Sequence, residues 1–244
     1  MTTPADEATR IGSAVSEVVE QVFRTVAEVQ AAAVRGLEQG QPTVGPGALT
    51  PFPGLEDPVR ALLQSPGQLA IGLGAVVAPQ PDLRLPLRLQ WWQMDPGRSL
   101  VMALEPDLKP SSVGFYDYAA TPWFDVPRRT GKRHVVGPYV DVHGTGRYLL
   151  TLTSPVLVDG QFLGVAGADV LVSRFETHVL RRLGPLRRPF LLLNEEGRVV
   201  LSTSAQWLTG SLYPTEGVGH EASRVPGTPW QLHLTEGSEE VAPA

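Results

Sequence analysis

Apolar residues follow a helical period over the first part of the chain. Between Asp6 and Gln39 they recur every three or four positions, which is the spacing of one face of an α-helix. The stripe consists of Ile11, Val15, Val18, Val22, Val26, Val29 and Ala33, widened by Val19 and Phe23. Gly40 and Pro42 end the pattern. The sequence therefore predicts one long helix over residues 6–39.

This helix is longer than a small domain is wide, since 1.5 Å per residue gives about 50 Å. Two interpretations of its apolar stripe remain open. The stripe packs along the helix's own domain, or part of it meets a second copy of the chain. We expect a homodimer through the N-terminal helix, and Val18→Glu combined with Val22→Glu would then yield a folded monomer.

From Leu69 onward the period shortens to that of strands. After a loop rich in Pro and Gly and a short helix over residues 55–64, three apolar segments are separated by breaks that contain Pro and Gly. They read LAIGLGAVV, LRLQWWQM and LVMALEP. The aromatic-rich residues 115–129 then predict a loop with a short helix from about Pro122, followed by a short strand over residues 139–142.

Two long strands form the strongest sheet signal. Residues 147–158 and 161–171 flank Asp159-Gly160, a pair that favours the two-residue turn of a β-hairpin. The remaining elements are a helix over 172–183, a second hairpin over 190–202 and a last strand over 230–234. Because most predicted strand pairs are neighbours in sequence, we expect an antiparallel sheet flanked by helices, which is an α+β architecture.

Composition and charge exclude several classes of protein. Of the 244 residues, 42% are hydrophobic and 18% are charged, a balance that can bury a core. The net charge of −5 argues against nucleic acid or an anionic membrane as the main partner, since both need a basic surface. Because the chain has no cysteine, disulfides and thiolate metal sites are excluded. With no long apolar segment and no signal peptide, we expect a soluble, cytoplasmic protein that does not enter a membrane.

Motifs of the common enzyme classes are absent from the sequence. It contains no G-x-S-x-G, G-x-x-x-x-G-K-[ST], H-E-x-x-H or dinucleotide-binding glycine pattern. Asp141 and His143 put an acid and a base on one face of a predicted strand, which leaves a small enzyme as an alternative. We predict a non-catalytic protein with no metal site and no cofactor.

Asp169 lies in the otherwise apolar strand GVAGADVLV. Burying a carboxylate is costly unless it is paired. Three explanations remain open: a hydrogen bond to nearby backbone, a salt bridge to an arginine such as Arg147, or a cationic ligand. Trp123, Phe124 and Tyr139 add aromatic faces, and such faces around one carboxylate suit an ammonium group. The alternative for these aromatic residues is an ordinary hydrophobic core.

Four segments between Tyr116 and Asp169 carry a family likeness. YDYAATPWF, GPYVD, TLTSPV and, after the Asp-Gly turn, GVAGADV follow one another in this order. Together they resemble the Cache sensor domains, the PAS-like ligand-binding modules of bacterial chemoreceptors and sensor kinases. The resemblance covers about residues 6–185 and implies a PAS-like antiparallel sheet flanked by helices, with a long N-terminal helix. We expect one Cache-like domain over residues 1–235, comprising the helix over 6–39, a sensor core over 55–185 and an added hairpin and strand over 186–235, followed by a flexible tail over 236–244.

The resemblance also implies a binding site. In family members that bind amino acids, an arginine and neighbouring aromatics hold the carboxylate, while a later tyrosine and the strand aspartate hold the ammonium group. By position, the ammonium half is Tyr139 and Asp169, and the aromatic residues are Tyr116, Trp123 and Phe124. Thr121 stands at the arginine position, so a bidentate donor has become a hydroxyl. This departure implies a sensor for a small amine-containing metabolite.

Other interpretations of the site remain. Arg128, Arg129 or Arg88 substitutes for the missing arginine, and the ligand is then an amino acid or a small carboxylate. Alternatively, the pocket is vestigial and the chain is an assembly module. A sensor needs an output, and a separate signalling partner is one way to supply it.

Overall fold

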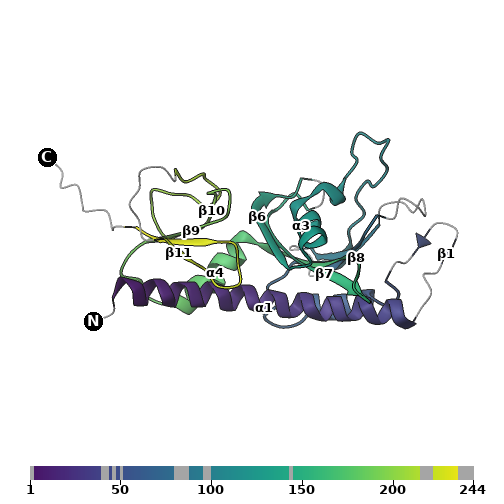
Figure 1. The fold of residues 1–244 in the computed structure, drawn as a ribbon, viewed down its shortest axis with the longest axis horizontal. Helices are drawn as coiled ribbons and strands as arrows, with labels where there is room; N and C mark the ends of the chain where they lie inside the picture. The colour runs from purple at the N-terminus through teal and green to yellow at the C-terminus, as the bar shows by residue number, and fades with distance from the viewer. Residues whose placement is uncertain are drawn as a thin grey trace. The chain divides into compact units, whose positions relative to one another are not determined.

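The chain folds into two compact units (Figure 1). The computed structural model describes residues 3–39, 44–45, 48–49, 52–79, 88–95, 100–142, 145–214 and 222–235. We call residues 1–20, 137–139 and 172–244 the terminal unit, and residues 21–136 and 140–171 the central unit. The single Cache-like domain expected over residues 1–235 stays a prediction.

Helix α1 spans Pro4–Gln39 and contributes to both units. It begins two residues before the predicted start, because Thr3 and Asp6 cap each other. The backbone N–H of Asp6 donates to Thr3 Oγ1 at 3.1 Å, and that of Thr3 donates to Asp6 Oδ2 at 2.9 Å. Each residue of the predicted apolar stripe from Ile11 to Ala33 is buried. The stripe therefore packs along its own chain, the first of the two interpretations.

This burial bears on the expected homodimer. A dimer through the apolar stripe would require a surface that the chain itself already covers. The dimer stays a prediction, and a contact through α1 would have to use the outer face of the helix. Val18→Glu and Val22→Glu would place charges in the interior, so they are expected to unfold the protein rather than yield a folded monomer.

The central unit is built on a six-stranded sheet in the order β5-β4-β3-β8-β7-β6. Its strands are β3 Gly72–Val77, β4 Leu89–Met94, β5 Val101–Ala103, β6 His134–Val140, β7 Tyr148–Val158 and β8 Gln161–Leu171. The pairs β3–β4, β3–β8, β4–β5 and β7–β8 are antiparallel. The predicted turn between β7 and β8 is confirmed, since Asp159 and Gly160 take φ angles of 50° and 77°.

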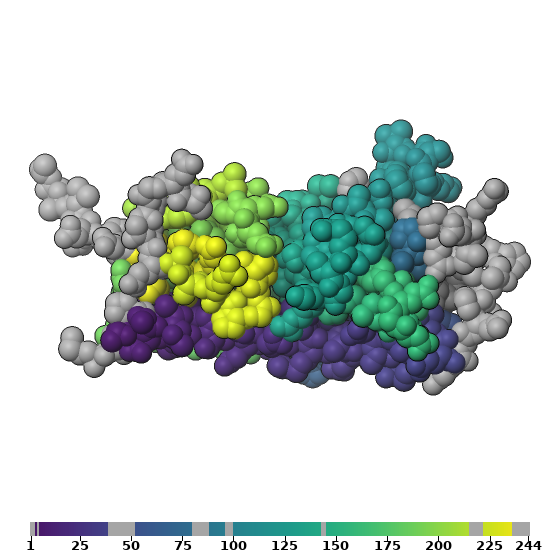
Figure 2. Space-filling view, in the orientation of Figure 1, coloured from purple at the N-terminus to yellow at the C-terminus, as the bar shows by residue number. Residues whose placement is uncertain are grey.

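Helices cover both faces of this sheet. The further elements of the central unit are α2 Glu56–Leu63, the single-turn helix η2 Tyr118–Ala120, α3 Pro122–Thr130, and a short pair of strands, β1 Val44–Gly45 and β2 Ala48–Leu49. On one face α1 runs along the sheet (Figure 1), and Gln30 Nε2 donates to the carbonyl of Pro155 on β7 at 2.7 Å. On the other face η2 and α3 pack over the sheet through a buried aromatic cluster. In Figure 2 the teal atoms of this region form an outer layer of the central unit. The predicted α+β class is confirmed.

The terminal unit contains a smaller sheet in the order β10-β9-β12-β11. Its elements are α4 Val172–Leu183, β9 Phe190–Leu193, β10 Val199–Ser202, β11 Ala222–Arg224 and β12 Gln231–Leu234. The predicted second hairpin and last strand are present, and β11 pairs with β12 to complete the sheet. Trp230 is buried and packs edge-on against Phe175 of α4, with ring centroids 5.6 Å apart. The tail expected over residues 236–244 lies outside the described residues.

Candidate ligand-binding site

Two rows of residues cross the face of the central sheet that α3 covers. Directly paired residues in adjacent antiparallel strands point to the same face, so the register defines the rows. The polar row consists of Gln93, Gly72, Asp169 and Thr151, on β4, β3, β8 and β7. The glycine row consists of Trp91, Gly74, Gly167 and Thr153, on the same strands. Asp169, the main candidate from the sequence, therefore lies inside the sheet between a glycine and a threonine.

The indole of Trp91 lies against the two glycines of its row. A Cβ atom on Gly74 would be 2.9 Å from the ring atom Cε3 of Trp91, and one on Gly167 would be 3.2 Å from Cη2. Side chains at these positions would displace the ring, because real Cβ atoms almost never approach other atoms within 3.0 Å. Trp91 is only 6% exposed, and its Nε1 lies beside Gly72, where a Cβ would be 2.8 Å away.

Gly74→Ala is expected to destabilise the protein by about 3 kcal/mol, as overpacking with backbone displacement does. The new Cβ would collide with the carbonyl oxygen of Gln90 and lie 2.7 Å from the Cα of Trp91, both of them backbone atoms of the paired strand. Gly72→Ala is the control, since its nearest contacts are the side-chain atoms Trp91 Nε1 and Asp169 Oδ2. Urea unfolding measures the free energy of unfolding of both variants. An equal loss of stability in the two would contradict this account.

Asp169 is buried and has no basic partner in the described part of the chain. It is 6% exposed, and the hydroxyl of Thr151 donates to its Oδ1 at 2.6 Å. Arg147, considered from the sequence as a salt-bridge partner, instead donates to the backbone carbonyl of Met94 at 3.1 Å. The salt bridge to Arg147 is therefore wrong. The hydrogen bond to Asp169 comes from a side chain rather than from local backbone, and a cationic ligand remains open.

Burial raises the pKa of the Asp169 carboxyl group from 3.8 to about 7. The hydroxyl of Thr151 lowers this pKa, the negative charge of Asp141 raises it, and the indole N–H of Trp91 lowers it slightly. The two polar neighbours offset only part of the cost of burial. The carboxyl group is therefore about half protonated near neutral pH, and a cation beside it would favour the charged form.

Tyr116 and Trp123 lie on the segment that covers this face. Burial raises the pKa of Tyr116 far above its ordinary value, the negative charges of Asp141 and Asp169 raise it as well, and a hydrogen bond with Trp123 lowers it. The hydroxyl group of Tyr116 therefore lies close enough to the carboxyl groups of Asp141 and Asp169 for their charges to act on it. Trp123 is held over the sheet because the Thr153 hydroxyl donates to its backbone carbonyl at 2.6 Å. Of the predicted site residues, the structure thus brings together Asp169, Tyr116 and Trp123.

Phe124 and Thr121 have structural contacts of their own. Phe124 is fully buried, and its ring centroid lies 5.3 Å from that of Tyr118 and 5.7 Å from that of Phe162. Thr121 precedes α3, and its hydroxyl donates to the backbone carbonyl of Tyr118 at 2.6 Å. Packing and local hydrogen bonding account for these residues, and their contacts with a ligand stay predictions.

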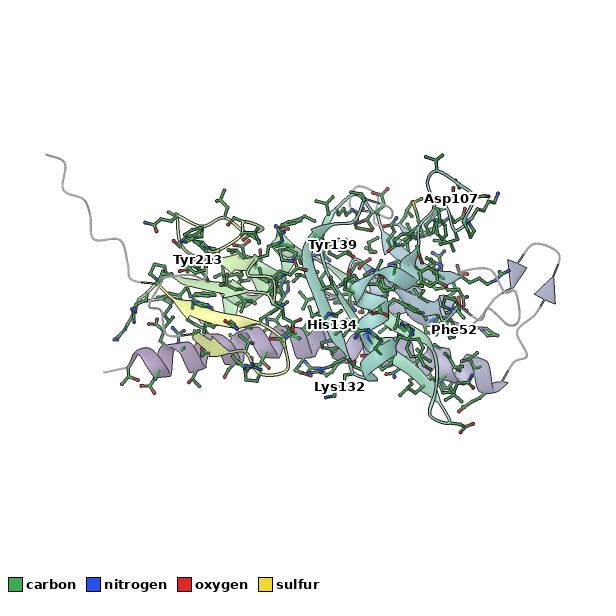
Figure 3. All side chains as sticks on the ribbon, turned by 45° about the horizontal axis from the view of Figure 1, so that its top comes forward. Phe52, Asp107, Lys132, His134, Tyr139 and Tyr213 are labelled. Atoms are coloured by element: carbon green, nitrogen blue, oxygen red, sulfur yellow. The ribbon has the colours of Figure 1, made fainter. Side chains whose placement is uncertain are left out.

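Tyr139 lies on β6 and is half-buried (Figure 3). It is grouped with the terminal unit, whereas Asp169 belongs to the central unit. The candidate site therefore consists of residues of the central unit. The contact of Tyr139 with a ligand stays a prediction.

Two of the three arginines considered as carboxylate partners are engaged elsewhere. Arg128 and Arg129 are exposed on α3, and each pairs with Asp125 at 2.6 Å. These pairs hold the pKa of Asp125 below its ordinary value, with Arg129 contributing more than Arg128. Arg88 donates its backbone N–H to the Tyr118 hydroxyl at 2.9 Å, and a contact of its side chain with a carboxylate stays a prediction.

No contact is described between Asp141 and His143, the acid and base considered for an enzyme. Asp141 closes a turn, because the backbone N–H of Thr145 donates to its Oδ2 at 2.7 Å. His143 lies outside the described residues. Within the described ranges, no group of three or more His, Asp or Glu residues is placed to hold a metal ion.

Sequence reasoning missed several members of the two rows. These are Gly72, Trp91, Gln93, Thr151 and Thr153. A signal for some of them exists, since Gly-Leu-Gly in β3 and Thr-Leu-Thr in β7 each put alternate residues on one face. The local pattern does not say which strands flank β8, so it cannot place these residues around Asp169.

Comparison with known proteins gives one partial sequence match. No family model matches the chain. The methyl-accepting chemotaxis protein TlpQ of Pseudomonas aeruginosa is 31% identical over 90 residues, which are 36% of this chain and 13% of that protein. The match thus spans a small part of the length of this relative.

Solved structures share the fold over nearly the whole chain. Methyl-accepting Chemotaxis protein X matches with a TM-score of 0.62 at 15% identity, covering 93% of this chain and 92% of that one. The ligand-binding domain of the P. aeruginosa amino acid chemoreceptor PctC, solved with GABA, matches with a TM-score of 0.57 at 18% identity, covering 94% and 95%. The chain has the fold of a Cache sensor domain. The resemblance read from the sequence is confirmed at the level of the fold.

The Cache fold also corrects the expected location. The extracellular domain of soHK1S-Z6, a protein assigned as a histidine kinase, has this fold with a TM-score of 0.58 at 14% identity over 94% of this chain and 91% of that one. The predicted cytoplasmic location is therefore wrong. Composition misled because a water-exposed domain has the same balance of apolar and charged residues on either side of a membrane. Within the described ranges, no helix is both long and apolar enough to cross a membrane.

Proposed function

We propose that this Cache-type domain is a non-catalytic sensor module that binds a small amine-containing metabolite, with the cationic nitrogen against Asp169. One observation carries the proposal: Asp169 is a buried carboxyl group with no basic partner among the described residues, and its pKa is raised to about 7. Such a perturbed group is a candidate functional site, because a bound cation offsets the cost of its burial.

The surroundings of Asp169 favour a cation over an anion. Asp141 adds a second negative charge that acts on Asp169. Trp91 and Trp123 are 6% and 7% exposed, and indole faces are the best aromatic partners for cations. Thr151 donates to Oδ1, and Oδ2, on the Gly72 side near the indole N–H of Trp91, has a further lone pair with which to accept from a ligand.

Similar structures support an amine-bearing ligand. The PctC domain was solved with GABA, which carries an ammonium group and a carboxylate. In this chain Thr121 stands where the resemblance implies an arginine, and its hydroxyl is engaged with Tyr118. We therefore propose that the ammonium group is the recognised feature and that a carboxylate is not required. Carboxylate binding through Arg88, Arg128 or Arg129 is the alternative, and it is weaker for Arg128 and Arg129 because both pair with Asp125.

A thermal-shift screen with matched compounds tests this proposal. Primary amines are compared with the alcohols of the same carbon skeleton, so that only the charged nitrogen differs. A ligand at a hundredfold excess over Kd raises the free energy of unfolding by about 2.7 kcal/mol. Asp169→Asn is expected to abolish every amine-dependent shift, whereas Asp159→Asn, in the exposed turn of the same hairpin, leaves it intact. Shifts that persist in Asp169→Asn would remove Asp169 from the site.

Amine affinity is expected to fall with pH below about 7. The ammonium ion pairs with the ionised carboxylate, and the pKa of Asp169 in the free protein is about 7. Each unit of pH below this value therefore weakens binding by roughly tenfold, because a proton must leave before the cation binds. Calorimetric titrations between pH 5 and pH 8 measure this slope. An affinity that is constant over this range would contradict the role given to Asp169.

A further inference from the structure

A buried polar atom near Asp169 lacks a hydrogen-bond partner among the described residues. It is Oε1 of Gln93, an acceptor. A buried polar group without a partner is costly, and native proteins leave few of them. Gln93 lies on β4 and belongs to the polar row that includes Asp169. The indole N–H of Trp91, on the same strand, acts on the Asp169 carboxyl group, whereas the pairing of Asp169 with a cation does not by itself account for the Gln93 oxygen.

A glycine leaves one place in the polar row without a side chain. Gly72 lies between Gln93 and Asp169 in the polar row. A Cβ atom on Gly72 would be 2.8 Å from Trp91 Nε1 and 3.1 Å from Asp169 Oδ2, so a side chain would fill this space. We call it the Gly72 notch. The carboxylate lines it on one strand, and the carboxamide of Gln93 points to the same face from the strand on the other side.

We propose that the Gly72 notch seats a primary ammonium group, which donates one N–H to Asp169 Oδ2 and a second to Gln93 Oε1. This inference rests on the proposed amine-binding function and adds a second ligand-binding residue and a narrower ligand class. Trp91 turns its N–H edge toward Oδ2 and positions the carboxylate between Thr151 and the ligand.

The number of donors decides which amines bind. A primary ammonium has three N–H groups and satisfies both acceptors at once. A quaternary ammonium has none, so it would leave the Gln93 oxygen buried without a partner. Its methyl groups are also larger than the hydrogens of a primary ammonium and would crowd the space beside Gly72, which Trp91 and Asp169 border. The site therefore discriminates by hydrogen bonding, beyond the cation–π attraction that both kinds of cation share.

Matched pairs of probes test the inference by calorimetry. The primary amines are ethanolamine and γ-aminobutyrate, and each is compared with its N,N,N-trimethyl derivative, choline in the first case. We expect the primary amine to bind at least tenfold more tightly in the native protein, as loss of a charge-assisted hydrogen bond predicts. Gln93→Leu is expected to weaken the primary amine by about tenfold and to leave the trimethyl compound unchanged. Gln161→Leu, at the exposed end of β8, is the control and leaves both affinities unchanged.

The outcomes separate this inference from the function on which it rests. If the primary amines bind and need Asp169, but Gln93→Leu keeps the native ratio of the two affinities, the inference is wrong and the proposed function stands. If neither primary amine binds the native protein, both are wrong. Gln93→Glu is the second variant, because its carboxylate keeps an acceptor at the same place. It is expected to restore the preference for primary amines that Gln93→Leu loses.

Discussion

Asp169→Asn is expected to stabilise the ligand-free protein at pH 8 while abolishing amine binding. At this pH the native chain holds an ionised carboxylate in a buried site, and this burial raises the pKa of the group to about 7. An asparagine keeps an oxygen that accepts from Thr151 but carries no charge. With 1.36 kcal/mol for each unit of pKa, the gain is on the order of 2 to 4 kcal/mol. Urea unfolding at pH 8, with and without an amine, measures both effects.

The sign of this effect changes with pH in a defined way. Because the folded pKa of Asp169 lies above its ordinary value of 3.8, the folded protein binds the proton more tightly than the unfolded chain does. Its contribution to stability is fully present below about pH 4 and is lost as the pH rises through about 7. The advantage of Asp169→Asn should therefore shrink from pH 8 toward pH 4. A variant that is less stable than the native chain at pH 8 would show that Asp169 is paired in the ligand-free protein.

Val26→Glu is expected to unfold the protein, whereas Ala27→Glu on the adjacent position has almost no effect. Val26 lies in the apolar stripe of α1 and is 0% exposed, while Ala27 is exposed on the same helix. A glutamate at position 26 would bury a charge without a partner, which costs about 3 to 5 kcal/mol in protein interiors. Circular dichroism on heating compares the two variants.

The same pair of variants also tests the expected homodimer. If the stripe were a dimer surface, Val26→Glu would remain folded and only its mass by light scattering would fall. A folded, monomeric Val26→Glu beside a dimeric native chain would therefore contradict the burial of the stripe. An unfolded Val26→Glu beside a folded Ala27→Glu supports it.

In the proposed site, a cost in folding stability is linked to a gain in ligand recognition. A carboxylate paired in advance with an arginine would need no ligand, and a neutral side chain would attract none. Among the described residues, Thr151 and the indole N–H of Trp91 are the polar neighbours that act on Asp169, and the proposed cation would offset what burial still costs. Selectivity for cations then follows from the same desolvation that raises the pKa of Asp169.

Much of the fold was predictable from local sequence. The stripe of α1 has the helical period, and Asp159-Gly160 adopts the turn that this pair favours. Asp169 drew attention because a carboxylate is rare in an apolar strand, and it is buried. These features depend on neighbours in the chain, so a pattern of a few residues is enough to reveal them. The location was not predictable in this way, because composition is the same on either side of a membrane.

The surroundings of Asp169 depended on an irregularity between β7 and β8. Counting back from the turn, where Val158 pairs with Gln161, a regular hairpin would place Leu150 opposite Asp169. The register shifts by one residue between Val156 and Leu157, and Thr151 takes that place instead. Gly164 makes the shift possible, since its φ of 152° and its closeness to the Val76 carbonyl exclude a side chain.

The sequence by itself therefore determined the elements and the residue at the centre of the candidate site. Only the tertiary structure decided which residues meet Asp169. Gly72, Trp91 and Gln93 reach it from strands that lie some 70 to 100 positions away in the chain, through the pairing of β8 with β3 and of β3 with β4. Local patterns record which face a side chain takes, but the order of strands in a sheet is set by packing across the whole unit.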